Sequence, residues 1–397
     1  MVATERAPVV EHTPSGTGPG VPAENGAINL VRVLAALAVV VSHAKTLLFV
    51  DWEETDQSLP VRAVYAMSSL GHQAVVVFFV LSGFWVGGAV VSRARAHRFS
   101  AAGYLTDRVT RLWVVLIPAL VLTAALDTIG RRLYADAAPY VGDARYAGLI
   151  RAPHPIDGVT FLGNAGFVAN IHVPTYGSNG ALWSLGYEFW MYVVGAAVVL
   201  LVLSRQRSRW WFVLAVAVVG AVVLKPAVLI YVPVWLAGAL VAAIAGPIRE
   251  WLARRTTVEL VAVRGGAVLA TVGTAVAVRL GSPPTWLGDY ALTVPTAVLI
   301  ATLVTGWRRA ESSPLGRVAG LASCSYSLYA IHLPVLVLAT AALGVEVEAR
   351  WHPDVPHLLA LAVILAAVTV VAWVFARGTE HHTPAVRRLA RRVLRTP

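Results

Sequence analysis

Charged residues and cysteine are both scarce in this chain of 397 residues. Charged side chains make up 13% of the sequence, whereas soluble domains carry roughly 25%, so one soluble core cannot account for the apolar residues. The one cysteine, Cys324, excludes an intramolecular disulfide and a cysteine-rich metal site. Residues 1–27 lack the apolar core of a cleavable signal peptide, and their proline- and glycine-rich composition predicts a disordered tail.

Apolar sequence is what the chain has in excess. Hydrophobic residues make up 57% of it, and the mean hydropathy is +0.69, so lipid is the expected solvent. Ten apolar segments reach or approach the length of about 20 residues that spans a bilayer. They are residues 28–50, 72–91, 109–127, 181–203, 210–224, 227–245, 258–279, 286–306, 319–343 and 357–376. The sequence therefore predicts an all-α, polytopic membrane protein with about ten transmembrane helices.

The basic residues predict the orientation of these segments. With the N-terminus inside, the inner segments hold 21 arginine and lysine residues and the outer segments hold 8. Cytoplasmic loops carry such an excess, so both termini are predicted to be cytoplasmic and the plasma membrane is the expected location. A formal net charge of +11 also suits nucleic acid, but short basic runs between apolar segments fit topology signals better. No nucleic-acid partner is expected.

Three parts of the chain are expected to differ in role. Residues 28–376 form the membrane domain, and the outer loop 128–180 within it is expected to fold back as a short helix and a lid, because long loops tend to be functional. Residues 377–397 form a basic cytoplasmic tail, which is expected to lie as a surface helix on anionic lipid. Membrane lipid is therefore an expected partner.

The first apolar segment contains two ionisable residues, Arg32 and His43, eleven positions apart. On a helix this separation is about three turns, so the two side chains share a face about 16 Å apart along the axis. Ionisable groups inside a membrane span are costly and usually functional. His43 is the candidate general base, because an imidazole accepts protons near neutral pH. The alternative is a histidine that only joins two helices by a hydrogen bond.

Two further arginines lie at the inner end of the third span. Arg108 and Arg111 are three residues apart and share a helix face. Together with Arg32 they would suit the phosphates of a bound ligand, because guanidinium groups recognise phosphate. The alternative for any one inner arginine is topological anchoring alone.

A carboxylate and a second histidine also lie within apolar spans. Glu188 forms a polar stripe with Ser184 and Tyr192, and it is predicted to orient His43 or hold an acceptor hydroxyl, or else to join an interhelical network. In the ninth span, Tyr329 and His332 share one face just before a proline at which a helix would kink.

Two smaller predictions concern the segment after the last span. Glu380 is expected to pair with an inner arginine. No metal site is predicted, because the adjacent His381 and His382 would point about 100° apart on a helix.

Five segments, taken in order along the chain, resemble the membrane acyltransferase-3 family. They are Asn29 to His43 (arginine and histidine separated by ten residues), Phe78 to Phe84 (FFVLSGF), Arg108 to Arg111, Tyr176 to Tyr192 (YGSNGALWSLGYEFWMY) and Ser325 to Pro334 (SYSLYAIHLP). Members of this family O-acylate carbohydrates, peptidoglycan and some secondary metabolites. The resemblance implies an acyl-CoA-dependent O-acyltransferase in its stand-alone form, without a soluble esterase-like domain.

The resemblance also implies roles for individual residues. His43 would be the catalytic base, with Glu188 as a second catalytic candidate, while Arg32, Arg108 and Arg111 would bind acyl-CoA, most simply acetyl-CoA. The candidates for acceptor binding are Tyr176, Asn179, Trp183, Ser184, Tyr329 and His332. Asn179, Trp183 and Tyr329 are also the candidates for stabilising an oxyanion.

Three questions stay open from sequence alone. The acceptor can be a glycan, a glycoside, a related metabolite or a lipid. Transfer can be direct or can pass through an acylated serine. The rival class is a secondary transporter or lipid flippase, which would also bury polar residues within about ten spans.

Overall fold

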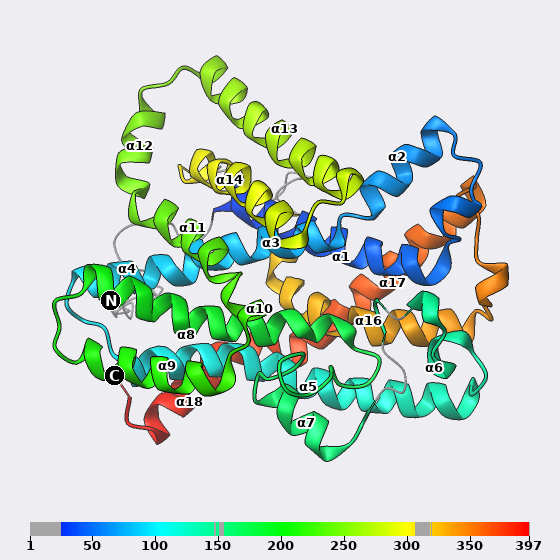
Figure 1. Cartoon of the computed structure of the whole chain (residues 1–397), viewed down its shortest axis with the longest axis horizontal. Coiled ribbons are helices and arrows are strands. Elements are labelled where there is room, and N and C mark those ends of the chain that lie inside the picture. Colours follow the sequence, from blue (N-terminus) through cyan, green and yellow to red (C-terminus); the bar gives the residue numbers. More distant parts are fainter. Residues whose placement is uncertain (1–24, 147, 151–154, 306–317, 319, 397) are drawn as a thin grey trace, which may run out of the picture.

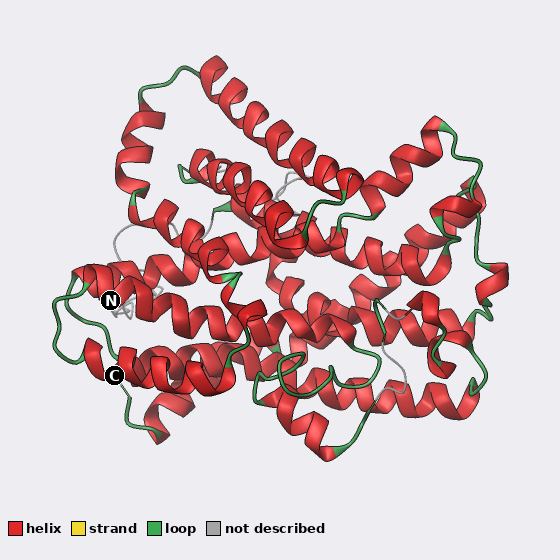
Figure 2. Cartoon of the chain, in the orientation of Figure 1, coloured by secondary structure: helices red, strands yellow, loops and turns green. Residues whose placement is uncertain are grey.

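The computed structural model describes residues 25–146, 148–150, 155–305, 318 and 320–396. Within these residues the chain is helical, with two isolated bridges and no strand (Figure 2). Nine described helices are long and apolar enough to cross a membrane, and the remaining predicted span is the shorter apolar helix Arg209–Val223. The all-α, polytopic prediction is confirmed for this part of the chain. The cytoplasmic placement of the termini stays a prediction, and most of the expected disordered tail lies outside the described residues.

The helices that correspond to the predicted spans begin and end within a few residues of their predicted limits, except that α5 is longer at both ends. They are α1 (Gly26–Leu48), α3 (Gly71–Ser82) with α4 (Gly88–Arg95), α5 (Ala101–Leu133), α8 (Trp183–Leu203), α9 (Arg209–Val223), α10 (Pro226–Leu229) with α11 (Val232–Ala243), α13 (Thr257–Gly281), α14 (Thr285–Leu303), α16 (Ser325–Ala342) and α17 (Val355–Gly378). The shorter helices between them are α2 (Leu59–Ser68), α6 (Ala138–Val141), α7 (Gly158–Ala165), α12 (Ala245–Ala253) and α18 (Thr383–Val393). Single turns complete the described part: η1 (Trp52–Glu54), the π-turn η2 (Gly83–Gly87), η3 (Ala144–Tyr146), η4 (Gly180–Leu182), η5 (Leu321–Cys324), η6 (Val347–Ala349) and η7 (Glu380–His382).

Helix α16 lies at the centre of the bundle and is buried along most of its length. It packs against α1, α5 and α17, while α3 packs between α1, α11 and α14, and α13 covers α14 (Figure 1). In that view α4 and α18 lie at one end of the bundle, and α2 and α6 lie at the other. The packing therefore brings α1, which carries Arg32 and His43, against a helix that is buried along most of its length.

The N-terminal end of α5 is joined to α18 through one buried carboxylate. Asp107 is 2% exposed, and Arg391 holds it with two hydrogen bonds of 3.0 and 2.8 Å. Arg93 and Arg387 lie 3.7 and 3.8 Å from the same carboxylate. A buried charge needs such partners, so α18 is fixed beside Arg108, the residue that follows Asp107.

Helices α3 and α11 cross with their backbones in contact. A Cβ atom on Gly238 would lie 1.9 Å from the carbonyl oxygen of Val80, and one on Gly83 would lie 1.8 Å from that of Trp235. Small residues permit such close approach of helices in membranes. The π-turn that starts at Gly83 lies at this crossing, so the crossing depends on glycine at both positions.

We expect Gly238→Ala to destabilise the protein by roughly 1–3 kcal/mol, because the added methyl group overpacks a backbone contact. Gly273→Ala is the matched control, since nothing lies within 4 Å of a Cβ at that position of α13. Alanine is the better helix former there by about 1 kcal/mol. Thermal unfolding in detergent, followed by tryptophan fluorescence, should give a lower Tm for the first variant only. Equal Tm values would contradict the close crossing.

Candidate active site

His43 on α1 and His332 on α16 form a hydrogen-bonded pair. The Nδ1 atom of His43 lies 2.8 Å from the Nε2 atom of His332. His332 is fully buried, so its ring needs partners within the protein. Its Nδ1 atom lies 2.8 Å from the carbonyl oxygen of Tyr329 and 3.1 Å from that of Leu328. Both nitrogens of His332 are therefore engaged.

These carbonyl contacts determine where the protons of the pair lie. A carbonyl oxygen only accepts hydrogen bonds, so Nδ1–H of His332 is the donor, and Nε2 of the neutral ring is then an acceptor. Nδ1 of His43 must donate to that Nε2. The remaining nitrogen of a neutral His43, Nε2, consequently carries a lone pair. The hydrogen-bond pattern thus assigns Nε2 of His43 as the atom that can take up a proton.

A proline kink in α16 explains the position of Asn179. Pro334 has no N–H, so the carbonyl of Ala330, four residues earlier, loses its helical partner. Asn179 Nδ2 donates to that carbonyl at 2.8 Å and to Thr123 Oγ1 at 3.2 Å. The amide therefore supports the segment of α16 that carries His332. Its oxygen, Oδ1, is buried without a hydrogen-bond partner among the described residues, and its predicted role in acceptor binding stays a prediction.

The other residues predicted to bind the acceptor lie in three places. Ser184 Oγ lies 2.6 Å from the hydroxyl oxygen of Tyr329, so α8 and α16 are joined beside the histidine pair. Tyr176 is buried in the outer loop, where its hydroxyl group donates to the carbonyl of Ile156 at 3.3 Å. Trp183 is the one of the set that lines the cavity described next.

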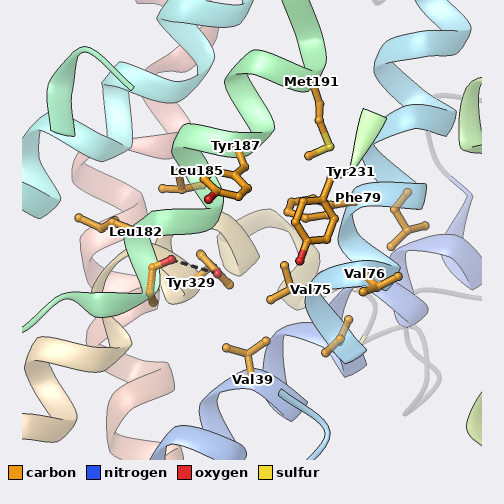
Figure 3. Close-up of a cluster of buried hydrophobic side chains, with 14 of the residues drawn as sticks. Val39, Val75, Val76, Phe79, Leu182, Leu185, Tyr187, Met191, Tyr231 and Tyr329 are labelled. Carbon is orange, nitrogen blue, oxygen red and sulfur yellow. Dashed lines mark hydrogen bonds between the residues drawn. The ribbon is translucent and has the colours of Figure 1, made fainter. Parts of the chain in front are cut away.

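A cavity of about 410 Å³ opens beside η4 and the start of α8. Its described lining residues are all uncharged. Four of them contribute aromatic rings: Trp183, Tyr187, Tyr231 and Trp286. Figure 3 shows Tyr187 and Tyr231 in an apolar cluster that also contains Val39 of α1, four residues before His43. Gly180, which also lines the cavity, lies next to α16, because a Cβ atom on it would be 3.7 Å from the side chain of Leu333, the residue after His332.

Two of the predicted arginines, Arg111 and Arg32, lie near a second buried carboxylate, Glu380. Arg111 Nη2 lies 2.8 Å from Glu380 Oε1. The other oxygen, Oε2, accepts from the backbone N–H and hydroxyl groups of Ser327 at 3.1 and 3.0 Å. The prediction that Glu380 pairs with an inner arginine is confirmed. Arg32 lies within electrostatic reach of both Arg111 and Glu380.

Two of the three predicted arginines, Arg32 and Arg108, have a buried N–H donor without a hydrogen-bond partner among the described residues. Arg32 lies over the ring of Trp85, 5.4 Å from its centroid, and donates through Nη2 to the carbonyl of Ala322. Arg108 lies over Tyr192 at 6.0 Å. The Nε atoms of Arg32 and Arg108 are buried without hydrogen-bond partners among the described residues. Unpaired buried donors are costly, and a phosphate would satisfy them.

Glu188 lies on α8 within electrostatic reach of Arg108 and Arg111. Its Oε1 atom accepts a hydrogen bond of 2.6 Å from the hydroxyl of Tyr192. The ring that the structure pairs with His43 is His332. A catalytic role for Glu188 therefore stays a prediction. The contacts given above join its carboxylate to Tyr192 and place it near Arg108 and Arg111.

The C-terminal end of α1 is held by a buried arginine, Arg350, which pairs with a half-exposed aspartate. Arg350 is 3% exposed, and its Nη2 atom lies 2.5 Å from Asp51 Oδ2. The hydroxyl of Tyr146 donates to the carbonyl of Leu47 at 3.2 Å. These contacts fix the last turn of α1, which follows His43 directly.

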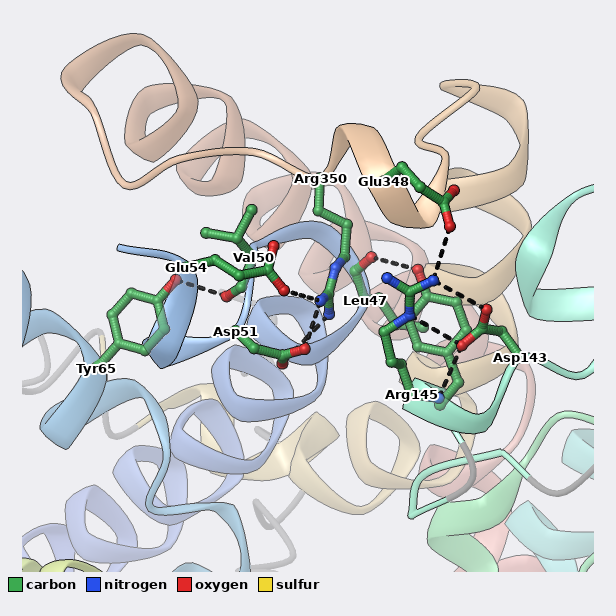
Figure 4. A network of polar contacts seen from close by, with 10 residues as sticks. Leu47, Val50, Asp51, Glu54, Tyr65, Asp143, Arg145, Glu348 and Arg350 are labelled. Carbon is green, nitrogen blue, oxygen red and sulfur yellow. Dashed lines mark hydrogen bonds and ion pairs between the residues drawn. The ribbon is translucent and has the colours of Figure 1, made fainter. Parts of the chain in front are cut away.

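A further arginine links the outer loop to the segment before α17. Arg145 hydrogen-bonds Asp143 at 3.2 Å and Glu348 at 2.8 Å (Figure 4). Because these hydrogen bonds favour the ionised carboxylates, Arg145 lowers the pKa of Asp143 and of Glu348. Asp143 and Glu348 are therefore ionised at neutral pH.

A histidine–carboxylate pair that was not predicted joins α3 to α14. His72 Nε2 lies 2.8 Å from Asp289 Oδ1, and the ring of His72 is stacked on Trp183. Both residues fall within predicted spans, 72–91 and 286–306. Ionisable residues at such positions are themselves a functional signal, so this pair was within reach of sequence reasoning.

Comparison with known proteins adds a family assignment. A family profile described as an acyltransferase domain matches residues 25–377. The chain is 25% identical to the O-acetyl transferase of Shigella phage Sf6 over 222 residues, which cover 54% of the chain and 58% of that protein. The match thus spans less than two thirds of the relative's length. No solved structure matches the chain.

Proposed function

The chain belongs to the acyltransferase-3 family, and from that premise we propose that it transfers an acyl group, most simply acetyl, from acyl-CoA to a hydroxyl group. The acceptor is a carbohydrate, a glycoside or a related metabolite, and the enzyme acts in the plasma membrane. The observation that carries the proposal is the His43–His332 pair, with Arg32 three turns away on the same helix.

The proposed chemistry uses Nε2 of His43 as a general base. This nitrogen takes the proton of the acceptor hydroxyl while the hydroxyl oxygen attacks the thioester carbonyl. The resulting imidazolium is stabilised because its Nδ1–H donates to His332. The tetrahedral intermediate then collapses, the carbon–sulfur bond breaks, and the same proton passes from His43 to the departing CoA sulfur. The products are an ester and CoA, and His43 returns to its starting state.

The donor is held at its charged end in this proposal. Arg32, Arg108 and Arg111 bind the phosphates of acyl-CoA at one end of the bundle, and the pantetheine arm extends from there towards His43. The support is the unpaired Nε donors of Arg32 and Arg108. Arg32 and His43 are about 16 Å apart along α1, a separation that an extended arm can bridge.

Trp183 is the preferred donor to the oxyanion among the three candidates. Both protons of the Asn179 amide are used by Ala330 and Thr123. The Tyr329 hydroxyl is engaged with Ser184. Trp183 lines the cavity, where an indole N–H can donate to a developing negative charge.

The direct test is CoA release from acetyl-CoA by the purified full-length protein in lipid nanodiscs. Candidate glycans and glycosides are added one at a time, and products are analysed by mass spectrometry for a gain of one acetyl group. Release of CoA together with an acetylated product is expected. Transport of an acceptor across vesicle membranes without any acetylated product would contradict the proposal.

His332 is expected to act as a positioning residue. Replacement by alanine removes the acceptor for Nδ1–H of His43, and we expect turnover to fall by about ten- to hundredfold, the loss of one hydrogen bond to a charged group. Replacement by glutamine supplies a new acceptor oxygen and should restore part of the rate. The acetyl-CoA affinity should change in neither variant. His352→Ala, on the exposed outer segment, is the control, and equal losses in the alanine and glutamine variants would exclude this role.

A further inference from the structure

The C-terminal helix α18 brings further arginines close to those proposed to bind the donor. The family profile ends at residue 377, before α18 begins, so the family assignment gives this helix no role. The helix packs along α5, where Arg391 binds the buried carboxylate of Asp107, the residue before Arg108. Arg387 lies one turn before Arg391, on the same face of α18. Both guanidinium groups therefore lie beside the N-terminal end of α5.

This cluster holds more positive than negative charge among the described residues. Arg391 donates two hydrogen bonds to Asp107, whereas Arg93 and Arg387 lie 3.7 and 3.8 Å from the same carboxylate, beyond hydrogen-bond distance. Arg387 also lies within electrostatic reach of Arg108. Like charges that share a site repel one another, so a bound anion would stabilise the cluster.

Arg387 carries an unsatisfied donor within the cluster. Its Nε atom is buried without a hydrogen-bond partner among the described residues, as is the Nε atom of Arg108. The side chain of Arg387 is nevertheless 36% exposed, so a ligand can reach its guanidinium group. Guanidinium groups recognise phosphate through several donors at once. The unpaired donor and the excess positive charge together indicate a phosphate group as the ligand.

The order of the arginines separates two phosphate positions. Arg32 shares α1 with His43 and lies within electrostatic reach of Arg111. Arg108 lies one turn before Arg111 on α5, and Arg387 lies within reach of both. Arg387 is thus at the end of the series that is farthest from His43. In acyl-CoA the diphosphate follows the pantetheine arm directly, and a further phosphate group lies beyond it on the ribose. The far end of the series therefore matches the ribose phosphate.

We propose that Arg387 binds the ribose phosphate of acyl-CoA and distinguishes acyl-CoA from donors that lack this group. The inference rests on the proposed acyltransferase function, and it adds a residue from beyond the family match to the donor site. Arg391 positions α18 through its hydrogen bonds to Asp107, and Arg387 donates to the phosphate oxygens. The diphosphate is left to the arginines of α1 and α5.

The test compares the dissociation constants of acetyl-CoA and acetyl-dephospho-CoA, measured by calorimetry on the full-length protein in nanodiscs of neutral lipid. Acetyl-dephospho-CoA keeps the diphosphate and lacks the ribose phosphate. The native protein should bind it about ten- to hundredfold more weakly than acetyl-CoA, as for the loss of a charged hydrogen bond. Arg387→Gln should weaken acetyl-CoA binding by a similar factor and leave acetyl-dephospho-CoA binding unchanged, because groups in contact give non-additive losses.

Arg388→Gln is the matched control, because it removes the same charge from an exposed position of α18. It should leave both dissociation constants at their native values. A native protein that binds the two donors equally, or an Arg387→Gln variant that loses affinity for both, would overturn the inference and leave the proposed function intact. Failure of the native protein to bind acetyl-CoA would count against the proposed function itself.

A lipid headgroup also carries phosphate, and a second set of titrations in nanodiscs that contain phosphatidylglycerol distinguishes this source. With the donor phosphate as the ligand, the preference for acetyl-CoA over acetyl-dephospho-CoA should persist in both kinds of nanodisc. With a lipid phosphate as the ligand, phosphatidylglycerol would raise the Tm of the native protein and of Arg388→Gln but not that of Arg387→Gln, and neither donor would be preferred. That second outcome would overturn the proposal.

Discussion

Replacing His43 by alanine is expected to lower acyl transfer by about a hundred- to ten-thousandfold, the range that a general base contributes. The reason is geometric, because Nε2 of His43 is the nitrogen of the pair that the tautomer assignment leaves free for a proton. In the variant, no side chain takes up the proton of the acceptor hydroxyl group while its oxygen attacks. The measurement is acetyl-CoA-dependent product formation at saturating donor and acceptor.

Two controls separate chemistry from folding in this experiment. The variant should bind acetyl-CoA with the dissociation constant of the native protein, since the phosphates are held by Arg32, three turns away on α1, and by Arg108 and Arg111 on α5. Its Tm should also stay close to the native value, because His43 is half-buried and alanine is a better helix former than histidine. Near-native turnover would remove His43 from the mechanism, whatever its contact with His332.

The spans could be predicted from sequence because apolar length is a local property. Each predicted segment corresponds to a helix of the described structure, and the break before Pro226 lies between α9 and α10. The short helices α2 and α12 were not predicted. They are brief elements at the ends of spans, where the hydropathy pattern gives no clear period.

The pairing of side chains could not be predicted in the same way. Arg32 and His43 share a face because both lie on one helix, so the periodicity is sufficient to relate them. The partner of His43 is 289 positions away in sequence, and the partner of Arg111 is 269 positions away. Only the packing order of the helices brings such residues together. The sequence therefore identified His332 as a candidate for binding the acceptor. Nothing in the sequence relates His332 to His43.

Asn179 illustrates a second limit. The sequence places it in a polar segment that resembles a substrate-binding block, and ligand contact is the natural interpretation. The structure adds a backbone reason, because Pro334 frees a carbonyl on α16 that the Asn179 amide satisfies. A free carbonyl before a proline can be satisfied by a polar side chain from any loop that reaches it. No local sequence pattern specifies which loop does so.

Replacing Arg32 by glutamine is expected to weaken acetyl-CoA binding by about ten- to hundredfold, as for the loss of a charged hydrogen bond. Arg32 is a better position for this test than Arg111, because Arg111 is paired with Glu380. Removing Arg111 would also leave a buried carboxylate unpaired. Arg388→Gln is the matched control, since this arginine is exposed on α18. The dissociation constants are measured by calorimetry on the protein in nanodiscs.

A truncated donor identifies the part of acyl-CoA that Arg32 contacts. Acetyl-pantetheine carries the thioester but lacks the nucleotide phosphates, so the native enzyme should use it poorly, and Arg32→Gln should use it as well as the native enzyme does. The losses caused by truncating the donor and by removing the guanidinium would then be non-additive, which is the signature of two groups in contact. If Arg32→Gln lowers the use of acetyl-pantetheine as much as that of acetyl-CoA, Arg32 acts on the thioester end or on the fold, and the phosphates are bound elsewhere.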